Sequence, residues 1–403
     1  AVPVEQVNKY IQDMIGDTNI VISLTGPEKE GLSYPTDEEL LRDFMKAQQI
    51  PVEPYRETLS DEPLIPSLPA PGKITESKED PLFGATVLTL SNGIKVVLKH
   101  TDFKKDKIQM TATSPGGSTL FGNKDIDNLK VFNEVIELGG LGNFSATDLG
   151  KMLAGKKVSC STSLGLDSEN VNGSSTPSDL KTLFELIYLS FTAPRMDEEA
   201  YASFENRMKA QLKNLELNPM VAFSDSLTKA IYNNNPRAMR IDPADFKNIS
   251  YPRIMEMYKE RFGDASGFVF TFVGNIDTDS IRPLVEQYLA TLPANGKIEQ
   301  GNPKEVPAIR KGDYVNRFKR QMETPKASVV NFYSGQMDYN LENIVTATML
   351  KQVLDLIYTE KVREDEGGTY GVQTSARISS FPEGQTFLQA YFDTDPDKRE
   401  KMN

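Results

Sequence analysis

Histidine and cysteine, the side chains that most often serve as metal ligands or nucleophiles, each occur once in the 403 residues. His100 ends the apolar run GIKVVLKH, which predicts an exposed residue at the end of a strand. Cys160 lies in KVSCSTSLGL, where residue types alternate as in a strand, so we expect a buried thiol with no catalytic role. Catalytic zinc usually takes at least two histidines, so the sequence provides no tetrahedral zinc site.

Two further residues could do chemistry, and they lie seven positions apart in EKVREDEGGTYGV, residues 360–372. Arg363 stays charged and Tyr370 keeps its proton at neutral pH, so both donate hydrogen bonds without needing a base. Gly367 and Gly368 would allow a sharp reversal between a helix ending at Arg363 and a strand starting at Tyr370, which points both side chains to one side. A structural role also suits the pattern, because an arginine in a last helical turn complements the helix dipole and a tyrosine packs well on a strand.

The N-terminal residues predict a helix, a strand and a second helix. Residues 4–15 have the periodicity of an amphipathic helix, and IVISLTG, residues 20–26, is an apolar strand stopped by Gly26-Pro27. The helix TDEELLRDFMKAQQ follows, with Thr36 as its N-cap. Seven prolines between residues 51 and 81 then predict an extended, semi-rigid connector.

Two later segments share one order of elements. The first opens with a hairpin, ATVLTLSNGIKVVLKH, around Asn92-Gly93. It continues as strand, helix, strand and strand over residues 107–176, before further helices and the strand FVFTFVG. The order strand, helix, strand, strand returns after residue 314, which indicates an internal repeat.

These patterns predict an α+β fold of repeated two-layer domains, each with an antiparallel-rich sheet packed on helices. We expect the tail of a preceding domain (residues 1–48), a proline-rich linker (49–81), a complete domain (82–295), a connector (296–313) and the first half of a further, truncated domain (314–403).

Charge and hydropathy exclude some partners. The 45 Lys and Arg against 57 Asp and Glu give a net charge of −12 and a pI near 4.9, which argues against nucleic acid or anionic lipid as the main partner. The purest apolar run, FVFTFV, is far too short to predict a membrane span. The first residues, AVPVEQVNKY, include no initiator methionine and no basic-then-apolar leader, so we expect a processed chain or a fragment.

The chain resembles the C-terminal half of the insulinase/pitrilysin family of zinc metalloendopeptidases over nearly its whole length. The most specific similarities are EKVREDEGGTYGV and FVGNID ahead of SIRPLVEQYLATLP, with TPKASVVNFYSG in support. The resemblance implies LuxS/peptidase-like domains, four of which stack into a two-halved chamber.

In this family the N-terminal half carries the inverted zinc motif H-x-x-E-H. The matching helix here reads VFNEV, so Val131 and Val135 replace both histidines while Glu134 stands where the general base would be. We therefore expect no metal and no cofactor in this chain, zinc in the missing N-terminal half, and Glu134 as an ordinary helix residue. The resemblance gives the catalytic role to Arg363 and Tyr370, which would stabilise the oxyanion formed at the peptide carbonyl.

The resulting prediction is the C-terminal portion of a zinc-dependent metalloendopeptidase, inactive by itself, which binds peptide substrates and pairs with a zinc-bearing N-terminal half. The alternative is a non-catalytic peptide-binding or scaffold subunit of the same family. Peptides could also add as a strand to a sheet edge, without the sequence showing which one. The unfinished last domain predicts self-association through apolar surface. The resemblance suggests a bacterial periplasm or cell envelope as the location.

Overall fold

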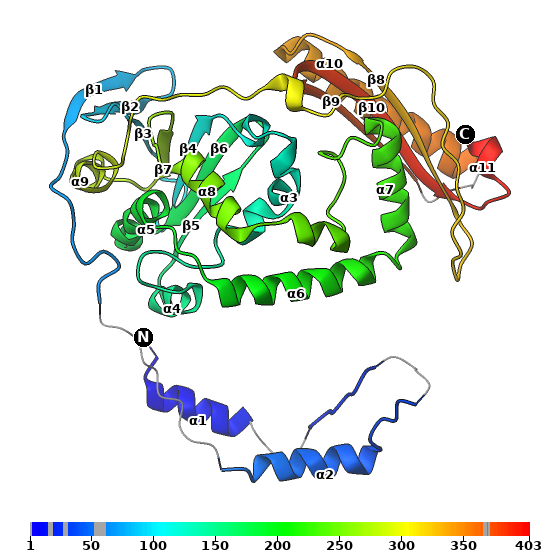
Figure 1. The fold of residues 1–403 in the computed structure, drawn as a ribbon, viewed down its shortest axis with the longest axis horizontal. Helices are drawn as coiled ribbons and strands as arrows, with labels where there is room; N and C mark the ends of the chain where they lie inside the picture. The colour runs from blue at the N-terminus through cyan, green and yellow to red at the C-terminus, as the bar shows by residue number, and fades with distance from the viewer. Residues whose placement is uncertain (1, 15–18, 27–30, 52–61, 366–368, 370) are drawn as a thin grey trace. The chain divides into compact units, whose positions relative to one another are not determined.

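The computed structural model describes residues 2–14, 19–26, 31–51, 62–365, 369 and 371–403 (Figure 1). The chain divides into two units, Ala1–Thr58 and Leu59–Asn403. Each unit is described by itself below.

The N-terminal unit contains two helices, α1 (Val4–Met14) and α2 (Asp37–Gln48), as the sequence predicts. Thr36 caps α2 as expected: its side chain accepts from the Glu39 backbone N–H while the Glu39 carboxylate accepts from the Thr36 backbone N–H. The strand predicted at residues 20–26 is wrong, because residues 19–26 have no regular structure. Ile20, Val21 and Leu24 are exposed there, and an apolar strand is stable only when it pairs in a sheet.

The larger unit begins with a seven-stranded mixed sheet in the order β1-β2-β3-β7-β4-β6-β5. Its only parallel pair among the described strands is β3 with β7. The strands are β1 (Ile74–Asp80), β2 (Ala85–Leu90), β3 (Lys95–His100), β4 (Ile108–Pro115), β5 (Val158–Leu164), β6 (Ser168–Ser175) and β7 (Val269–Gly274). The sequence predicts an extended connector over residues 49–81, but Ile74–Asp80 of this segment forms the strand β1, which pairs antiparallel with β2. β1 is rich in charged residues, as edge strands often are.

The predicted hairpin at Asn92-Gly93 joins β2 to β3, but only Gly93 adopts a positive φ, of 85°. The Asn92 side chain instead donates to the carbonyl oxygens of Leu289 and Leu292, at 2.9 and 3.1 Å. The turn therefore holds the sheet to a segment almost 200 residues away.

Helices pack on this sheet around an aromatic core. Phe184 of α5 stacks on Phe272 of β7 with ring centroids 5.0 Å apart, and Phe191 meets Phe268 edge to face at 5.0 Å. The helices are α3 (Ile126–Val135), α4 (Ala146–Met152), α5 (Leu180–Thr192), α6 (Glu198–Leu215), α7 (Pro219–Tyr232), α8 (Tyr251–Phe262) and α9 (Thr278–Leu284), which continues as a π-helical turn, η5 (Val285–Leu289). Short 3₁₀ turns are η1 (Ser118–Leu120), η2 (Asn123–Asp125), η3 (Pro177–Asp179), η4 (Pro243–Asn248) and η6 (Pro303–Glu305).

A second sheet follows in the order β8-β10-β9, fully antiparallel. Its elements are β8 (Ala327–Gln336), α10 (Leu341–Tyr358), the π-helical turn η7 (Thr359–Asp365), β9 (Val372–Ser380), β10 (Glu383–Thr394) and α11 (Arg399–Met402). The segment ahead of it is held to α7, because Arg310 donates to the carbonyl oxygens of Ile231 and Ala230, both at 2.7 Å. The fold is thus a mixture of helices and antiparallel-rich sheets, as predicted.

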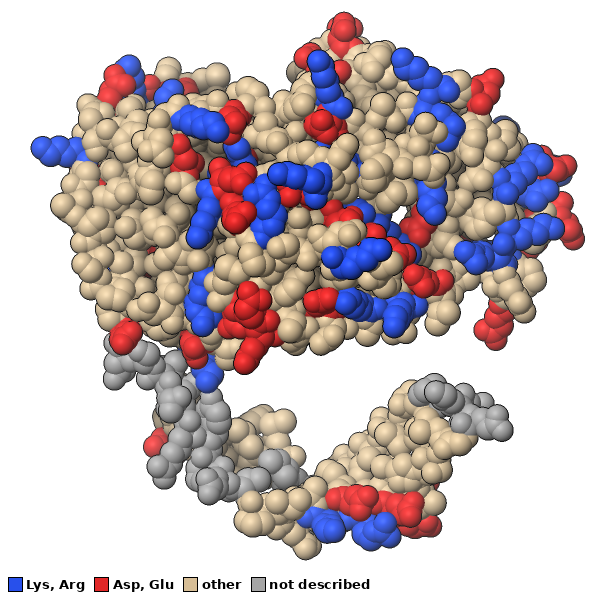
Figure 2. Space-filling model, in the orientation of Figure 1, with Lys and Arg blue, Asp and Glu red and all other residues tan. Residues whose placement is uncertain are grey.

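The surface carries both charge signs close together. On the face drawn in Figure 2, acidic and basic side chains are interspersed over α6 and α8. Lys209 contacts Glu205 on α6 at 2.5 Å, and Arg253 contacts Glu260 on α8 at 2.7 Å. In the part of the chain that the structure describes, no helix has the length and apolar character needed to cross a bilayer.

Candidate functional site

The segment that carries the predicted Arg363 and Tyr370 connects α10 to β9. Arg363 lies in η7, where the backbone is described but its side chain is not, and Tyr370 lies outside the described residues. On either side the chain is well anchored: Val362 packs against the small core of Val372, Ala390 and Phe392. The helix and the strand predicted on either side are found as η7, which ends at Asp365, and β9, which begins at Val372. The turn predicted at Gly367 and Gly368 lies outside the described residues, and the geometry between the Arg363 and Tyr370 side chains stays a prediction.

Asp355 fixes the helix to the strand beside this turn. Its carboxylate accepts hydrogen bonds from the backbone N–H of Thr374, at 3.2 Å, and from the Thr374 hydroxyl. It also forms an ion pair with Lys351 one turn earlier, at 2.6 Å. Partial burial opposes ionisation, but the bonds from Lys351 and Thr374 outweigh it and lower the pKa of Asp355 below its ordinary value.

The anchoring by Asp355 should therefore depend on pH. A lowered pKa means that the carboxylate stabilises the folded state above the unfolded pKa of about 3.9, and that this stabilisation is lost as pH falls through the folded pKa. We expect the Thr374 amide to exchange hydrogen faster in Asp355→Asn than in the native chain at pH 6. The difference should shrink as pH falls through the lowered folded pKa of Asp355, because below that pKa both side chains are neutral. Equal exchange at pH 6, measured by mass spectrometry or NMR, would contradict the anchoring role.

The helix that corresponds to a zinc helix does not fit a metal. Val131 and Val135 of α3 are 1% and 0% exposed and belong to the main hydrophobic core. Glu134 is exposed on the same helix, as expected for an ordinary surface residue. Within the described residues, no group of three or more His, Cys, Asp or Glu side chains could hold a metal ion. Two buried valines provide no lone pair, so no catalytic step at this helix can use zinc.

The lone histidine and cysteine have structural positions. His100 is exposed at the end of β3, as predicted, with Nδ1 2.8 Å from the carbonyl oxygen of Ile276. Cys160 is partly buried on β5 against the core. Burial raises the pKa of the Cys160 thiol to about 12, so almost none of the reactive thiolate is present at neutral pH.

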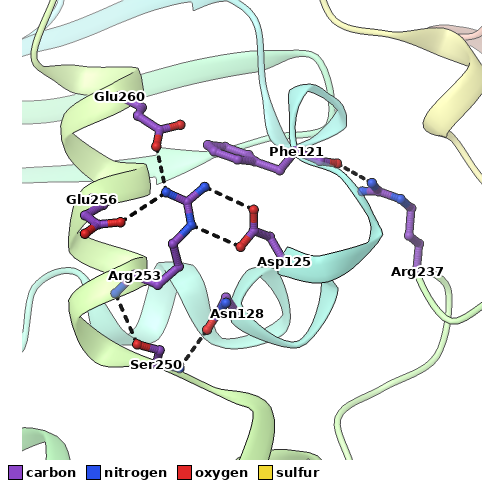
Figure 3. A network of polar contacts seen from close by, with 8 residues as sticks. All are labelled: Phe121, Asp125, Asn128, Arg237, Ser250, Arg253, Glu256 and Glu260. Atoms are coloured by element: carbon purple, nitrogen blue, oxygen red, sulfur yellow. Dashed lines mark hydrogen bonds and ion pairs between the residues drawn. The ribbon is translucent and has the colours of Figure 1, made fainter.

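An ion-pair network holds α8 against the start of α3 (Figure 3). Arg253 donates from Nε and Nη2 to the two carboxylate oxygens of Asp125, at 3.1 and 3.0 Å, and from Nη1 to Glu260 at 2.7 Å. Asp125 is buried, and the hydrogen bonds from Arg253 lower its pKa below the ordinary value. Asn128 adds a contact by accepting from the Ser250 backbone N–H at 2.9 Å. The bidentate ion pair between Arg253 and Asp125 fixes the angle of α8 over α3.

Two hollows lie away from the η7–β9 turn. A cavity of about 160 Å³ beside α3 has mainly apolar walls, with Lys130, Arg237 and Glu305 among its polar residues. An open groove of about 510 Å³ runs along α7 near Met220, Met239 and the Arg240–Asp225 ion pair. No residue of η7 or β9 lines either hollow.

Sequence reasoning missed the anchoring groups. Asp355 gave only one local signal, its four-residue spacing from Lys351, and nothing local connected Asp125 with Arg253. Both contacts are made across the fold, so they became visible only with the tertiary arrangement.

A protein-family model described as "Peptidase M16 inactive domain" matches residues 248–403. Residues 248–403 belong to the peptidase M16 inactive-domain family. The matched region runs from the last residue of η4 through α8 to α11, so it includes EKVREDEGGTYGV and FVGNID, the two segments with the most specific resemblance. The resemblance to the insulinase/pitrilysin family is confirmed.

Curated relatives of this chain are described as zinc proteases. Over 400 residues it is 24% identical to "Zinc protease PQQL-like" of Arabidopsis thaliana, covering 95% of this chain and 37% of the relative. It is 22% identical over 330 residues to "Probable zinc protease PqqL" of Escherichia coli, covering 81% of this chain and 35% of the relative. The chain thus spans little more than a third of the length of these relatives.

Solved structures with the same fold include the periplasmic protease PqqL from Escherichia coli, with a TM-score of 0.73, 18% identity, and coverage of 91% of this chain and 40% of that one. The peptidase M16 inactive domain from Pseudomonas fluorescens superposes with a TM-score of 0.59 and 16% identity, covering 79% of this chain and 76% of that one. At such identities the similarity establishes the fold.

Proposed function

We propose that this chain is the C-terminal portion of a zinc-dependent metalloendopeptidase that hydrolyses peptides in a two-halved chamber. The observation that carries the proposal is the M16 inactive-domain match over residues 248–403, which contains both Arg363 and Tyr370. The zinc and the residues that bind it would belong to an N-terminal half, because Val131 and Val135 cannot supply ligands here.

The chain would contribute hydrogen-bond donors to the reaction. When a peptide carbonyl is attacked, its oxygen gains negative charge, and fixed donors aimed at that oxygen lower the barrier by about 3 kcal/mol each. Arg363 would supply a permanent positive charge and Tyr370 a neutral hydroxyl, both from the turn that Asp355 and Thr374 anchor. Neither donor needs to lose a proton, so both work throughout the neutral pH range.

The domain division follows from the same proposal. We take residues 82–295 as a complete peptidase-like domain and residues 314–403 as the first half of a second one, with residues 1–48 as the tail of a third. The support is the shared order of pairing, β4-β6-β5 and β8-β10-β9, each with a helix after its first strand. A periplasmic location is proposed from the printed description of the Escherichia coli structure.

A non-catalytic peptide-binding or scaffold subunit is the second candidate, since the matched family is described as inactive. The presence of both Arg363 and Tyr370 favours the catalytic proposal, because a scaffold needs neither donor.

Mixing the chain with a zinc-bearing N-terminal half of the same protein tests the function. We expect neither half to cleave a fluorogenic peptide alone, and the equimolar mixture to restore turnover that a chelator abolishes. The control is the mixture made with a chain truncated before Ala327, which lacks the segment that carries both donors. Full turnover with the truncated chain, or none with the complete chain, would refute the proposal.

A further inference from the structure

A buried arginine lines the cavity of about 160 Å³ beside α3. The Arg237 side chain is 10% exposed, and its Nη2 contacts the Glu305 carboxylate at 2.9 Å. The same Nη2 donates a hydrogen bond to the carbonyl oxygen of Phe121 (Figure 3). The Arg237 Nε–H has no hydrogen-bond partner among the residues that the structure describes. Buried donors in folded proteins are nearly always paired, so we expect an acceptor for this N–H inside the cavity.

The turn after α7 fixes the position of Arg237. Asn233 and Asn234 adopt left-handed backbone conformations, with φ of 53° and 59°, which asparagine tolerates better than most residues. The Asn235 side chain then accepts a hydrogen bond from the Arg237 backbone N–H at 3.0 Å. Because the backbone and the guanidinium of Arg237 are both held, the direction of its Nε–H is fixed.

Water alone does not suit this cavity. Its volume is several times the roughly 30 Å³ that one water molecule occupies in the liquid, and each buried water needs about two to four polar partners. The walls are mainly apolar, and an apolar cavity of about 150 Å³ holds a benzene ring, so an apolar group of that size fits here. The apolar residues that line the cavity are Ile126, Leu129, Phe132, Leu164, Leu166 and Pro307.

The charges around the cavity favour a neutral acceptor over an anion. Lys130 pairs with Asp127 at 2.9 Å and with Asp245 at 3.2 Å. Arg237 pairs with Glu305. Among the described residues of these pairs, two cations thus face three carboxylates, and a further negative charge would be repelled. A neutral carbonyl oxygen can accept a hydrogen bond from the Arg237 Nε–H without adding charge.

We propose that this cavity binds a leucine- or phenylalanine-sized side chain of a peptide, whose own carbonyl oxygen accepts a hydrogen bond from the Arg237 Nε. The described lining residues lie between positions 118 and 307, so the cavity is formed far from both ends of the chain. It shares no described residue with the η7–β9 turn and would be a second point of contact with a peptide. The inference rests on the proposed function only in taking a peptide as the source of this residue.

NMR titrations with capped single amino acids, observed on the ligand, test the chemistry of the site. N-acetyl-leucine amide should bind the chain, and N-acetyl-glycine amide should bind at least about tenfold more weakly, because it has no side chain to bury. N-acetyl-leucine, whose free carboxylate represents a small acid or a peptide C-terminus, should bind at least about threefold more weakly than the leucine amide. Equal binding of the leucine and glycine amides, or tighter binding of the carboxylate, would overturn the proposal.

Substitutions in the cavity test its location. Arg237→Lys keeps a positive charge beside Glu305 but removes the Nε–H, so it should weaken the binding of N-acetyl-leucine amide at least about threefold. Leu129→Trp fills the cavity and should abolish binding. Its matched control is Leu217→Trp, which should bind like the native chain, because Leu217 is 82% exposed and is not among the described lining residues.

Circular dichroism checks that each variant is folded. Native-like binding by Arg237→Lys would refute the assignment of the acceptor even if Leu129→Trp does not fold. Native-like binding by folded Leu129→Trp would place the ligand outside the cavity and refute the site.

The same titration in the equimolar mixture with the zinc-bearing half distinguishes a peptide ligand from another segment of the protein. We expect the dissociation constant of N-acetyl-leucine amide to change by less than about threefold. Loss of binding would show that the other half fills or closes the cavity and would overturn the proposal. None of these measurements requires turnover, so a failure here is distinct from a failure to restore peptide cleavage.

Discussion

Replacing Tyr370 by phenylalanine should lower kcat about 100-fold in the enzyme reconstituted with its zinc-bearing half, the size of effect found when one oxyanion donor is removed. The hydroxyl would contact the carbonyl oxygen mainly once charge develops on it, so KM should change by less than about threefold. Steady-state kinetics on one fluorogenic peptide measures both constants. Arg363→Lys should fall between the native enzyme and Tyr370→Phe, because lysine keeps the charge but loses the planar donor geometry.

The matched control for Tyr370→Phe is Tyr333→Phe. Tyr333 is 65% exposed on β8, so the loss of its hydroxyl should leave kcat and KM unchanged. An unchanged kcat in Tyr370→Phe would remove Tyr370 from the mechanism. A rise in KM alone would instead assign the residue to peptide binding.

Asp125→Asn should destabilise the larger unit by roughly 2 to 3 kcal/mol, because it leaves Arg253 partly buried without its paired carboxylate. Glu260 still accepts a hydrogen bond from Arg253, so the loss of folding free energy should be smaller than for a buried charge with no partner. Urea unfolding at pH 7, followed by circular dichroism, measures the change in the free energy of unfolding.

The control for this prediction is Asp106→Asn. Asp106 pairs with Lys157 at 3.5 Å, and both side chains are about 70% exposed. Removing such a surface pair should cost less than about 0.5 kcal/mol. Equal changes in the two variants would show that the Arg253 network contributes no more than a surface ion pair.

Elements with local signals were predictable from the sequence. The N-cap of α2 follows from Thr36 and Glu39 three residues apart, and β9 and β10 follow from their alternating patterns. The lack of both histidine ligands in α3 was also readable, since VFNEV has valines at those two positions. In each case the deciding residues lie within a few positions of one another.

Features that depend on distant partners were not predictable. IVISLTG has the pattern of a strand, but strand formation needs a neighbour that this residue pattern does not supply. β1 was assigned to the connector because its sequence, ITESKED, is charged and its pairing with β2 is a tertiary property. The Arg253–Asp125 and Thr374–Asp355 contacts span 128 and 19 residues, beyond the reach of any local rule.

The π-helical turn η7 sets the angular position of residue 363 around the axis of the helix. Such a turn holds more residues than an α-helical one, so every later position is rotated relative to a regular continuation of α10. Deleting one residue between Tyr358 and Arg363 would turn the Arg363 Cα by about 100° around the axis without altering its chemistry. The angular position of the Arg363 Cα around the helix axis is therefore encoded in the length of this segment, and homologous chains can be compared at this point by residue count as well as by residue type.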